Sequence, residues 1–434
     1  MKDLVAVILA GGSGSRFWPL SEKALFSFMG KTFFEHAVGS TLPKEVKRVV
    51  VIASPDNESF FANLKLSVPH TTVVQHEPKG MADAILAAEK NLQSSSLLVM
   101  NGDDIHRPGV YEGVLSQAKI SKAFGVIPGW KTDTYRDLGY LVLDKGNIQK
   151  IVEKPGAGNE PSHFVFMVSY FVEDSNTLLD EMKKTKSDRD DVHEVALSAL
   201  MQSHQFEMYE HTGGFASLKY PWDVLAVMNL LLKNLKAHKG SHVTIKSNVV
   251  IEGEVWIGDN VKIFENTKII GPCYIGPNSI IGNNNLIRES HIGANCVTGF
   301  NTDITRSYVG NDCWFHSNYI GDSVLEGNVG MGSGAVLANL RLDEGEIFSS
   351  VKSERVNTGR NKLGAIIGCD TRIGVNVSIM PGVKIGPGSL IGAGVVLEQD
   401  LPDTSFCMLT SGGYTVTKNT RKSTTNRDKF KKHL

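Results

Sequence analysis

Hydrophobic and polar positions follow one rule in the first half of the chain and another in the second. Up to about residue 235, short apolar runs alternate with segments whose apolar residues recur at helical spacing. In chain order, we expect strands at 4–9, 48–53, 95–102 and 123–128, and helices at 32–40, 82–92 and 176–184. Strands that alternate with helices predict a parallel, doubly wound α/β sheet. Ligands of such sheets bind in the loops that follow the carboxyl ends of the strands.

In the second half, isoleucine recurs at every sixth position from Ile251 to Ile287, and again from Ile367 to Ile391. A six-residue period with an inward aliphatic side chain is typical of a parallel β-helix, in which each short strand forms one face of a triangular coil. Glycine and asparagine supply the tight left-handed corners. We therefore predict a left-handed, all-β parallel helix over residues 236–409.

These patterns divide the chain into an α/β domain at 1–235, the β-helix at 236–409 and a polar, basic tail at 410–434. Segment 340–364 breaks the six-residue period, and we expect it to project from the coils as a loop. The tail has few apolar residues, and we expect it to be flexible.

Composition argues against several classes of partner and site. The chain has 434 residues with 45 basic and 46 acidic side chains, a net charge of −1, so nothing points to a nucleic-acid or membrane partner. The first apolar run is too short for a signal peptide or a membrane span. The five cysteines show no CxxC spacing. We expect a cytoplasmic, reduced protein with no structural zinc.

The loop after the first strand reads "GGSGSR" and carries the first candidate chemistry. It fits neither the dinucleotide pattern G-x-G-x-x-G with a later acidic residue nor the P-loop pattern. Backbone N–H groups of residues 11–15 can wrap phosphate oxygens, and the guanidinium of Arg16 can neutralise them by a bidentate contact. Lys23 adds a point charge for a second phosphoryl group. The loop is therefore a candidate polyphosphate site.

This loop resembles the hallmark L-A-[AG]-G-x-G-[ST]-R of the sugar-1-phosphate nucleotidylyltransferases. Further matches follow in the family's order: "QHEPKGMADA", "MNGDD" and "LGYLVLDKGNIQKIVEKP". The resemblance implies nucleotide binding by Gly11, Gly12, Gly14, Gln75 and Gly80, a magnesium ligand at Asp103, sugar contacts from Gly139, Glu153 and Lys154, and catalytic roles for Arg16, Lys23 and Asp103.

The reaction implied joins a sugar-1-phosphate to the α-phosphorus of a nucleoside triphosphate and releases pyrophosphate. Such chemistry needs positioning and charge neutralisation but no covalent nucleophile. Mg²⁺ is the expected cofactor. The spacing from Arg16 to Lys23 is similar to that of uridylyl enzymes, whereas "FWPLS" is closer to mannose- and glucose-1-phosphate enzymes, so base and sugar stay open.

Several positions depart from the family pattern. Glu22 stands where proline is usual, Ser217 where a second metal-binding aspartate is usual, and Met167 where a small residue opens the sugar pocket. A serine hydroxyl is a poor substitute for a carboxylate on magnesium. The alternative is therefore a catalytically impaired regulatory or scaffold subunit that binds nucleotide-sugar and associates with an active homologue.

The β-helix carries a second resemblance. "FHSNYIGDSVLEGNVGMGSGAVLANL" is similar to the acetyltransferase domain of bifunctional uridylyltransferase/acetyltransferases, especially the archaeal type. The resemblance implies that His316 is the general base, that Tyr319 and Asn339 bind the sugar or the developing oxyanion, and that Ala393 contacts acetyl-CoA.

Two departures in this half affect substrate choice. Thr305, with Arg306 beside it, takes the place of a basic residue, and Val375 takes that of a serine. The alternatives are a β-helix that serves only as a trimerisation stalk, or a pure acyltransferase whose first half delivers substrate. Because neighbouring coils can bury flat faces around a threefold axis, we expect a homo-trimer or a dimer of trimers.

Overall fold

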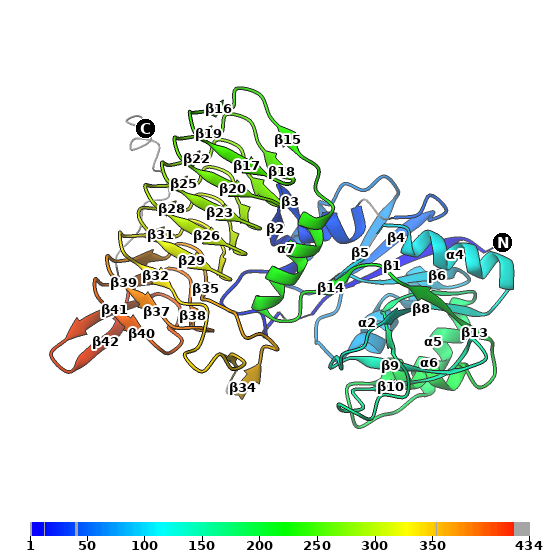
Figure 1. Ribbon diagram of the computed structural model, residues 1–434. Coiled ribbons are helices and arrows are strands. Elements are labelled where there is room, and N and C mark those ends of the chain that lie inside the picture. The colour runs from blue at the N-terminus through cyan, green and yellow to red at the C-terminus, as the bar shows by residue number, and fades with distance from the viewer. Residues whose placement is uncertain (1, 13, 40–41, 107, 353, 421–434) are drawn as a thin grey trace. The chain divides into compact units, whose positions relative to one another are not determined.

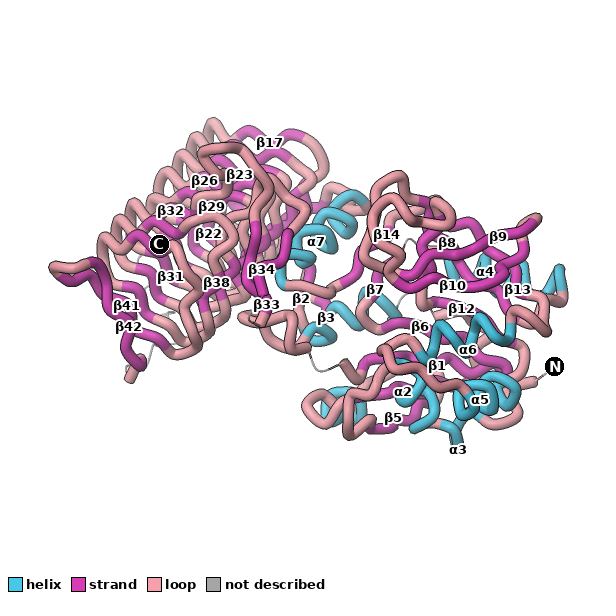
Figure 2. Tube along the Cα trace, turned by 90° about the horizontal axis from the view of Figure 1, so that it is seen from below, coloured by secondary structure: helices cyan, strands magenta, loops and turns pink. Residues whose placement is uncertain are grey.

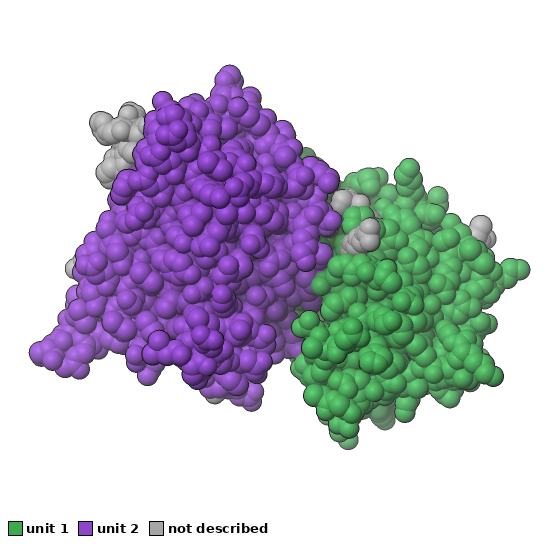
Figure 3. Space-filling model, in the orientation of Figure 1, with its two compact units in different colours: residues 1–13, 34–215 green, residues 14–33, 216–434 purple. Residues whose placement is uncertain are grey.

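The computed structural model describes residues 2–12, 14–39, 42–106, 108–352 and 354–420, and the chain divides into two compact units. Unit 1 comprises Met1–Ser13 and Phe34–Phe215, and unit 2 comprises Gly14–Phe33 and Ala216–Leu434 (Figure 3). This division differs from the expected boundary at residue 235. Residues 14–33 and 216–235 group with the β-helix, so the segment that carries Arg16 and Lys23 belongs to unit 2.

Unit 1 is built on one ten-stranded sheet with the order β11-β9-β10-β13-β8-β12-β6-β1-β4-β5 (Figure 1). Its strands are β1 (Leu4–Ala10), β4 (Arg48–Ala53), β5 (His70–Val74), β6 (Ser96–Asn101), β8 (Gly125–Lys131), β9 (Gly139–Asp144), β10 (Asn147–Glu153), β11 (Phe164–Phe166), β12 (Ser169–Val172) and β13 (Phe206–His211). The four strands expected from the apolar runs are therefore confirmed. Strands β5, β4, β1 and β6 are parallel, as predicted.

The sheet is mixed rather than wholly parallel. Strand β12 runs antiparallel to β6 and β8, and β9 pairs antiparallel with β10. Only Lys145 and Gly146 separate β9 from β10, and such a short connection can join only antiparallel strands. Local hydrophobic runs carry no information about strand direction.

Helices cover both faces of this sheet. They are α1 (Glu58–Ala62), α2 (Met81–Ala87), α3 (Glu89–Leu92), α4 (Val110–Ser121), α5 (Ser175–Lys184) and α6 (Val192–Leu200). Apolar residues of α2, α5 and α6 share one core with the sheet. Figure 2 shows these helices beside the strands of unit 1. Val114 and Ala118 of α4 pack with Val126, whereas the next residue, Ile127, belongs to the core under α2, α5 and α6. Because successive strand residues point to opposite faces, α4 lies on the other face of the sheet.

Two expected helices differ from the structure. The segment at 32–40 contains a five-residue π-helix, Glu35–Gly39. Residue 40, the last of the expected helix, lies outside the described residues. The segment at 82–92 divides at Ala88 into α2 and α3. The smaller elements are β2 (Ser27–Phe28), β3 (Lys31–Thr32), β7 (Asp104–His106), β14 (Phe215–Ser217), and the 3-10 helices Lys23–Leu25 and Pro221–Asp223.

Unit 2 holds α7 (Val224–Lys233) and the predicted β-helix (Figure 1). Each coil contributes a strand to each of three sheets, and the strands of successive coils pair in parallel. The first sheet contains β15 (His238–Lys239), β18 (Val255–Ile257), β21 (Cys273–Ile275), β24 (His291–Ile292), β27 (Tyr308–Val309), β30 (Val324–Leu325), β35 (Ile366–Ile367) and β38 (Lys384–Ile385). The second contains β16 (Thr244–Ile245), β19 (Lys262–Ile263), β22 (Ile280–Ile281), β25 (Val297–Thr298), β28 (Trp314–Phe315), β31 (Gly330–Met331), β36 (Arg372–Ile373), β39 (Leu390–Ile391), β41 (Ser405–Thr410) and β42 (Gly413–Lys418). The third contains β17 (Val250–Glu252), β20 (Lys268–Ile270), β23 (Leu286–Arg288), β26 (Asp303–Thr305), β29 (Tyr319–Gly321), β32 (Val336–Leu337), β37 (Ser378–Ile379) and β40 (Val396–Leu397).

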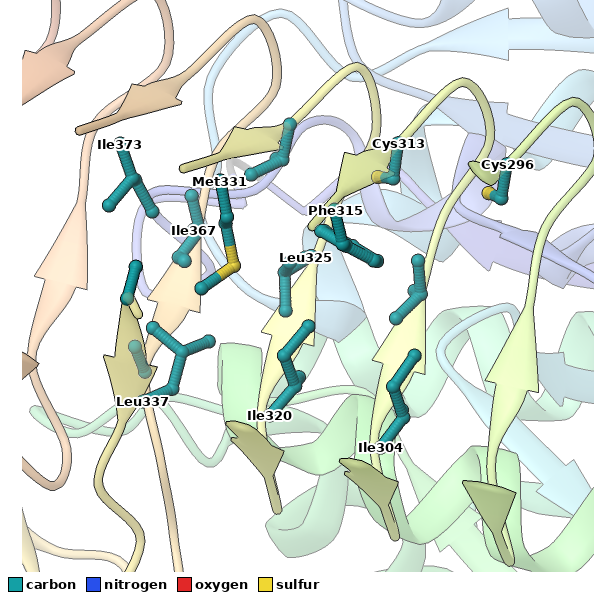
Figure 4. Packing of buried hydrophobic residues seen from close by; sticks show 14 of the residues in the cluster. Cys296, Ile304, Cys313, Phe315, Ile320, Leu325, Met331, Leu337, Ile367 and Ile373 are labelled. Atoms are coloured by element: carbon teal, nitrogen blue, oxygen red, sulfur yellow. The ribbon is translucent and has the colours of Figure 1, made fainter. Parts of the chain in front are cut away.

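The isoleucine period marks the inside of the coils. Ile257 to Ile287 and Ile367 to Ile391 supply buried side chains to one continuous core, part of which Figure 4 shows. Ile251, in the first coil, is 38% exposed. Asparagines with left-handed backbone angles, such as Asn260 (φ 58°) and Asn278 (φ 59°), form the corners as expected. Their amides also form a hydrogen-bonded ladder between coils, with 3.0 Å from Asn260 Nδ2 to Asn278 Oδ1.

The irregular segment at 340–364 contains an antiparallel hairpin of β33 (Phe348–Val351) and β34 (Glu354–Asn357). The tail is ordered further than expected, because β41 and β42 pair antiparallel up to Lys418. Strand β41 pairs with β39 of the last coil, and Cys407 and Tyr414 of the hairpin pack with the core of the β-helix. Residues 421–434, the rest of the expected flexible tail, lie outside the described ones.

Among the described residues, no helix has the length and apolar character needed to cross a membrane.

Candidate functional site

The parallel strands of unit 1 bring the predicted nucleotide and metal motifs to one edge of the sheet. Leu9 of β1 pairs with Asn101 of β6, so Gly11 and Asp103 follow the carboxyl ends of adjacent strands. The N–H of Gly102 donates to Leu9 O at 2.8 Å. A Cβ at Gly102 would lie 2.8 Å from that same oxygen, so only glycine fits between the two strand ends.

Gln75 and Gly80 meet at the same edge, beside Gly11. The Gln75 side chain is buried, and its Nε2 donates to the carbonyl oxygen of Gly80 at 3.1 Å and to Asp83 Oδ2 at 2.8 Å. Its Oε1 lies 3.5 Å from the point where a Cβ of Gly11 would stand. Gly80 has a φ of 93°, which favours glycine. The residues predicted to read the base are thus in contact, and Asp83 is a partner that the motif comparison missed although it lies within "QHEPKGMADA".

The predicted sugar-contacting residues lie on the β9–β10 hairpin. Gly139 and Glu153 are directly paired across the two strands, and a Cβ at Gly139 would lie 2.9 Å from Glu153 Oε2. Lys154 Nζ lies 3.4 Å from Glu153 Oε1. Met167, which departs from the family pattern, is buried in the core. The structure therefore brings Gly139, Glu153 and Lys154 together as one cluster.

Arg16 and Lys23 belong to unit 2, whereas Gly11, Gly12, Gln75, Gly80 and Asp103 belong to unit 1. Arg16 is exposed, and its guanidinium carbon lies 6.0 Å from the centre of the Tyr220 ring. Lys23 is 7% exposed, in the turn Lys23–Leu25. The loop residue Gly14 also lies in unit 2, and Ser13 lies outside the described residues.

The metal residues can be tested against their donor chemistry. Within the described ranges, no three His, Cys, Asp or Glu side chains gather into a ready-made metal cage. Mg²⁺ commonly binds through one or two carboxylates plus substrate phosphates, so a single carboxylate such as Asp103, after the end of β6, fits a substrate-borne magnesium ion. The N–H of Asp103 is held by Asn101 Oδ1 at 3.2 Å.

Asp223 does not replace the missing carboxylate at Ser217. Its Oδ2 accepts the backbone N–H groups of Tyr220 at 2.6 Å and Lys219 at 3.0 Å. This carboxylate therefore caps the turn that leads into α7. Desolvation raises the pKa of Asp223, although the two backbone donors oppose the shift.

In the β-helix, the predicted Tyr319 and Asn339 lie in neighbouring coils. The Tyr319 hydroxyl donates to Asn339 Oδ1 at 3.3 Å, and Asn339 Nδ2 donates to Asp322 Oδ2 at 2.5 Å. The same carboxylate accepts Nε of Arg306 at 2.7 Å and its Nη2 at 2.8 Å. Arg306, next to Thr305, is thus bound to Asp322. The pair Arg306 and Asp322 was not predicted, although "YIGD" contains the carboxylate.

His316 is exposed and lines a cavity of about 420 Å³ together with Trp314, Met331 and Arg372. Tyr319 lines a second cavity of about 410 Å³ with Asp303. Val375 and Ala393 are both exposed on later coils. Their turns are adjacent, because the N–H of Gly394 donates to Val375 O at 2.9 Å.

Two family models match this chain, one in each half. The nucleotidyl transferase family model matches residues 5–220, and the bacterial transferase hexapeptide model, with six repeats, matches 254–289 and 364–399. Over 413 residues the chain is 32% identical to the bifunctional sugar-1-phosphate nucleotidylyltransferase/acetyltransferase of Sulfurisphaera tokodaii, covering 91% of this chain and 98% of that relative. The chain belongs to this family.

Further relatives extend over the same length. The chain is 29% identical over 428 residues to the bifunctional protein GlmU of Methanococcus vannielii, covering 92% of this chain and 96% of the relative. Among solved structures, UDP-glucose pyrophosphorylase complexed with UDP-glucose covers 53% of this chain and 98% of its own, with 17% identity and a TM-score of 0.48. The predicted bifunctional family is confirmed by the relatives.

Proposed function

We propose that the chain condenses a nucleoside triphosphate with a sugar-1-phosphate and that its β-helix transfers an acetyl group to an amino-sugar phosphate. The observation that supports the first activity is the gathering of Gly11, Gln75, Gly80 and Asp103 at the carboxyl ends of β1, β5 and β6. This is the edge at which parallel sheets bind nucleotides.

In the first reaction, a phosphate oxygen of the sugar-1-phosphate attacks the α-phosphorus, and the bond between that phosphorus and the bridging oxygen of pyrophosphate breaks. The family roles of Arg16 and Lys23 are to bind the leaving pyrophosphate and the reacting phosphates. Asp103 would hold a magnesium ion on those phosphates, and the ion would supply charge neutralisation. Gly139, Glu153 and Lys154 would orient the sugar.

In the second reaction, the amine nitrogen of the amino-sugar phosphate would attack the thioester carbonyl of acetyl-CoA, and His316 would take a proton from that nitrogen. The carbon–sulfur bond then breaks, and CoA leaves as the thiol after it gains a proton. Tyr319 and Asn339 would bind the sugar or the developing oxyanion. Ala393 would contact the CoA chain in a groove shared by two copies of a trimer.

Two assays on one preparation test these activities. Pyrophosphate release is measured with Mg²⁺, a panel of triphosphates and a panel of sugar phosphates, with Asp103→Asn as the inactive control. CoA release is measured with glucosamine-1-phosphate and galactosamine-1-phosphate, with His316→Ala as the control. Activity that survives either control variant would contradict the role given to that residue.

A second candidate function rests on Ser217, which leaves the family's second metal position without a carboxylate, and on Asp223, which is used as a cap. In that case the chain binds nucleotide-sugar as a regulatory subunit and the β-helix assembles the trimer. Calorimetric binding of a nucleotide-sugar, together with no pyrophosphate release for any substrate pair, would favour this function over catalysis.

A further inference from the structure

We propose that Asp83 is a positioning residue for the nucleobase: it fixes the amide of Gln75 so that the carbonyl oxygen, and not the NH₂ group, is offered to the base. The proposal rests on the proposed nucleotide-binding function. It deepens that function, because it assigns a class of base to the pocket and a task to a side chain that the motif comparison did not single out.

The contacts of Gln75 fix the orientation of its amide. Gln75 Nε2 has two hydrogens, and two acceptors lie within reach: the Gly80 carbonyl oxygen at 3.1 Å and Asp83 Oδ2 at 2.8 Å. Neither acceptor can donate a hydrogen. If the amide were flipped, its oxygen would face both of these oxygens, and two hydrogen bonds of a side chain only 7% exposed would become repulsive contacts. The network therefore assigns the nitrogen to the side of Gly80 and Asp83.

The residues around this amide are held in place by other elements. The backbone N–H of Gln75 donates to Ala53 O at 2.9 Å, which ties the residue to the end of β4. Gly80 is fixed in a left-handed conformation, with Asp190 Oδ1 only 2.4 Å from the point where a Cβ would stand. Asp83 lies in the first turn of α2. Gln75 thus meets two acceptors whose positions are set by other elements.

The oxygen of the Gln75 amide lies beside the phosphate loop. Gln75 Oε1 lies 3.5 Å from the absent Cβ of Gly11, the residue that opens the phosphate loop. A carbonyl oxygen only accepts, so the ring atom that it reads must carry a hydrogen. We place Gln75 opposite the ring nitrogen of the base's pairing edge, where uracil and thymine carry N3–H and guanine carries N1–H, whereas cytosine and adenine carry an acceptor there and donate only from their exocyclic amino groups. Asp83 therefore makes the pocket select bases with a ring N–H.

Calorimetry with matched pairs of triphosphates tests this inference. UTP against CTP, and GTP against ATP, compare bases of similar size that differ in the ring N–H. We expect the wild-type chain to bind the N–H member of the preferred pair about tenfold more tightly, since one unmade hydrogen bond costs about 1.4 kcal/mol. Asp83→Asn and Asp83→Ala should reduce that ratio to about threefold or less, because only the Gly80 carbonyl oxygen then opposes the flip of Gln75.

Two controls separate positioning from a structural effect. Tripolyphosphate reports on the phosphate loop alone, and its affinity should be the same in the wild type and both Asp83 variants. Glu89→Gln makes a similar change of charge on the neighbouring α3, where Glu89 pairs with Lys183 at 2.6 Å, and it should leave the base preference unchanged.

The outcomes are distinct. An unchanged base preference in both Asp83 variants would overturn the inference, and so would an equal loss of tripolyphosphate and base affinity. A wild-type chain that binds UTP or GTP but shows no preference within either pair would overturn it while the proposed function stands. A wild-type chain that binds none of the triphosphates would instead remove the proposed function on which it rests.

Discussion

Replacement of Asp322 by asparagine should destabilise the β-helix far more than the same change at Asp303. Both carboxylates pair with an arginine at the end of a third-sheet strand or directly after it, and the two arginine side chains have similar exposure, at 33% for Arg306 and 34% for Arg288. The carboxylates differ: the Asp322 side chain is 8% exposed and that of Asp303 is 31% exposed. The two pairs therefore differ in the burial of the acid and in the additional hydrogen bond that Asp322 accepts from Asn339.

The magnitude follows from the contacts. Asp322 accepts three hydrogen bonds, two from Arg306 and one from Asn339, and an asparagine in its place cannot accept all of them. Removing one partner of a buried pair costs about 3–5 kcal/mol, and the partial exposure of Arg306 reduces this to about 2–3 kcal/mol. The more exposed Asp303 pair is worth about 1 kcal/mol or less.

Chemical denaturation followed by circular dichroism measures both losses of unfolding free energy under one set of conditions. Asp322→Asn should also weaken any amino-sugar binding through Asn339, because the amide of that residue loses the carboxylate that orients it. Equal losses for the two variants, or a neutral Asp322→Asn, would show that burial does not set the strength of this pair and would refute the reasoning.

Three further results are expected. Gly80→Ala should lower the unfolding free energy by about 1–3 kcal/mol, because alanine is strained at a φ of 93°, and calorimetry should show weaker triphosphate binding. Ser217→Asp should raise the magnesium affinity or the rate of pyrophosphate release, since it restores an oxygen ligand, and a folded variant with no gain would argue that the site is inactive for other reasons. Light scattering should give a trimer or a dimer of trimers, and a monomer of about 47 kDa at micromolar concentration would remove the shared CoA groove.

The β-helix could be predicted from sequence because its period is local. Each coil repeats the same choice of an inward isoleucine and a left-handed corner, so a six-residue pattern specifies both the fold and its core. The direction of β12 and the pairing of β9 with β10 could not be predicted in the same way. Strand direction depends on connections and neighbours, which leave no period in a hydrophobic run.

The candidate sites show the same division. Gly11, Gln75, Gly80 and Asp103 could be predicted because they stand in recognisable motifs after strands. Asp83 and Asp322 stand inside the same motifs, yet their tasks appear only when the atoms they contact are known: the Nε2 of Gln75 and the Nδ2 of Asn339. In both cases a carboxylate fixes the orientation of a neighbouring amide, and no residue spacing encodes an orientation.

The position of segment 14–33 depends on contacts that are still more distant in sequence. Trp18 Nε1 donates to Asp403 Oδ1 at 2.7 Å, and the N–H of Ser21 donates to Glu326 Oε1 at 2.7 Å. The other oxygen of Glu326 accepts the N–H of Cys369 at 3.0 Å, so one carboxylate ties this segment to two coils. Partners separated by more than 300 residues give no local signal, and the motif alone placed Arg16 and Lys23 in the first domain.

The surface on which this segment packs does show a pattern in the sequence. Five aromatic side chains of the first β-helix sheet stack with ring centres 4.6 to 4.9 Å apart: His238, Trp256, Tyr274, His291 and Tyr308. They recur every 17 or 18 residues, which is the length of one coil, because a residue of each coil lies directly over its equivalent in the next.

Segment 14–33 packs on the later rungs of this aromatic stack. The ring centres of Phe26 and Tyr308 lie 5.0 Å apart, and the N–H of Met29 donates to Nε2 of His291 at 3.0 Å. Nδ1 of His291 in turn donates to Val309 O at 3.0 Å, so the neutral imidazole has the tautomer that can accept from Met29. The later rings of this column are therefore covered by the segment that carries Arg16 and Lys23, and all of these residues belong to the same unit.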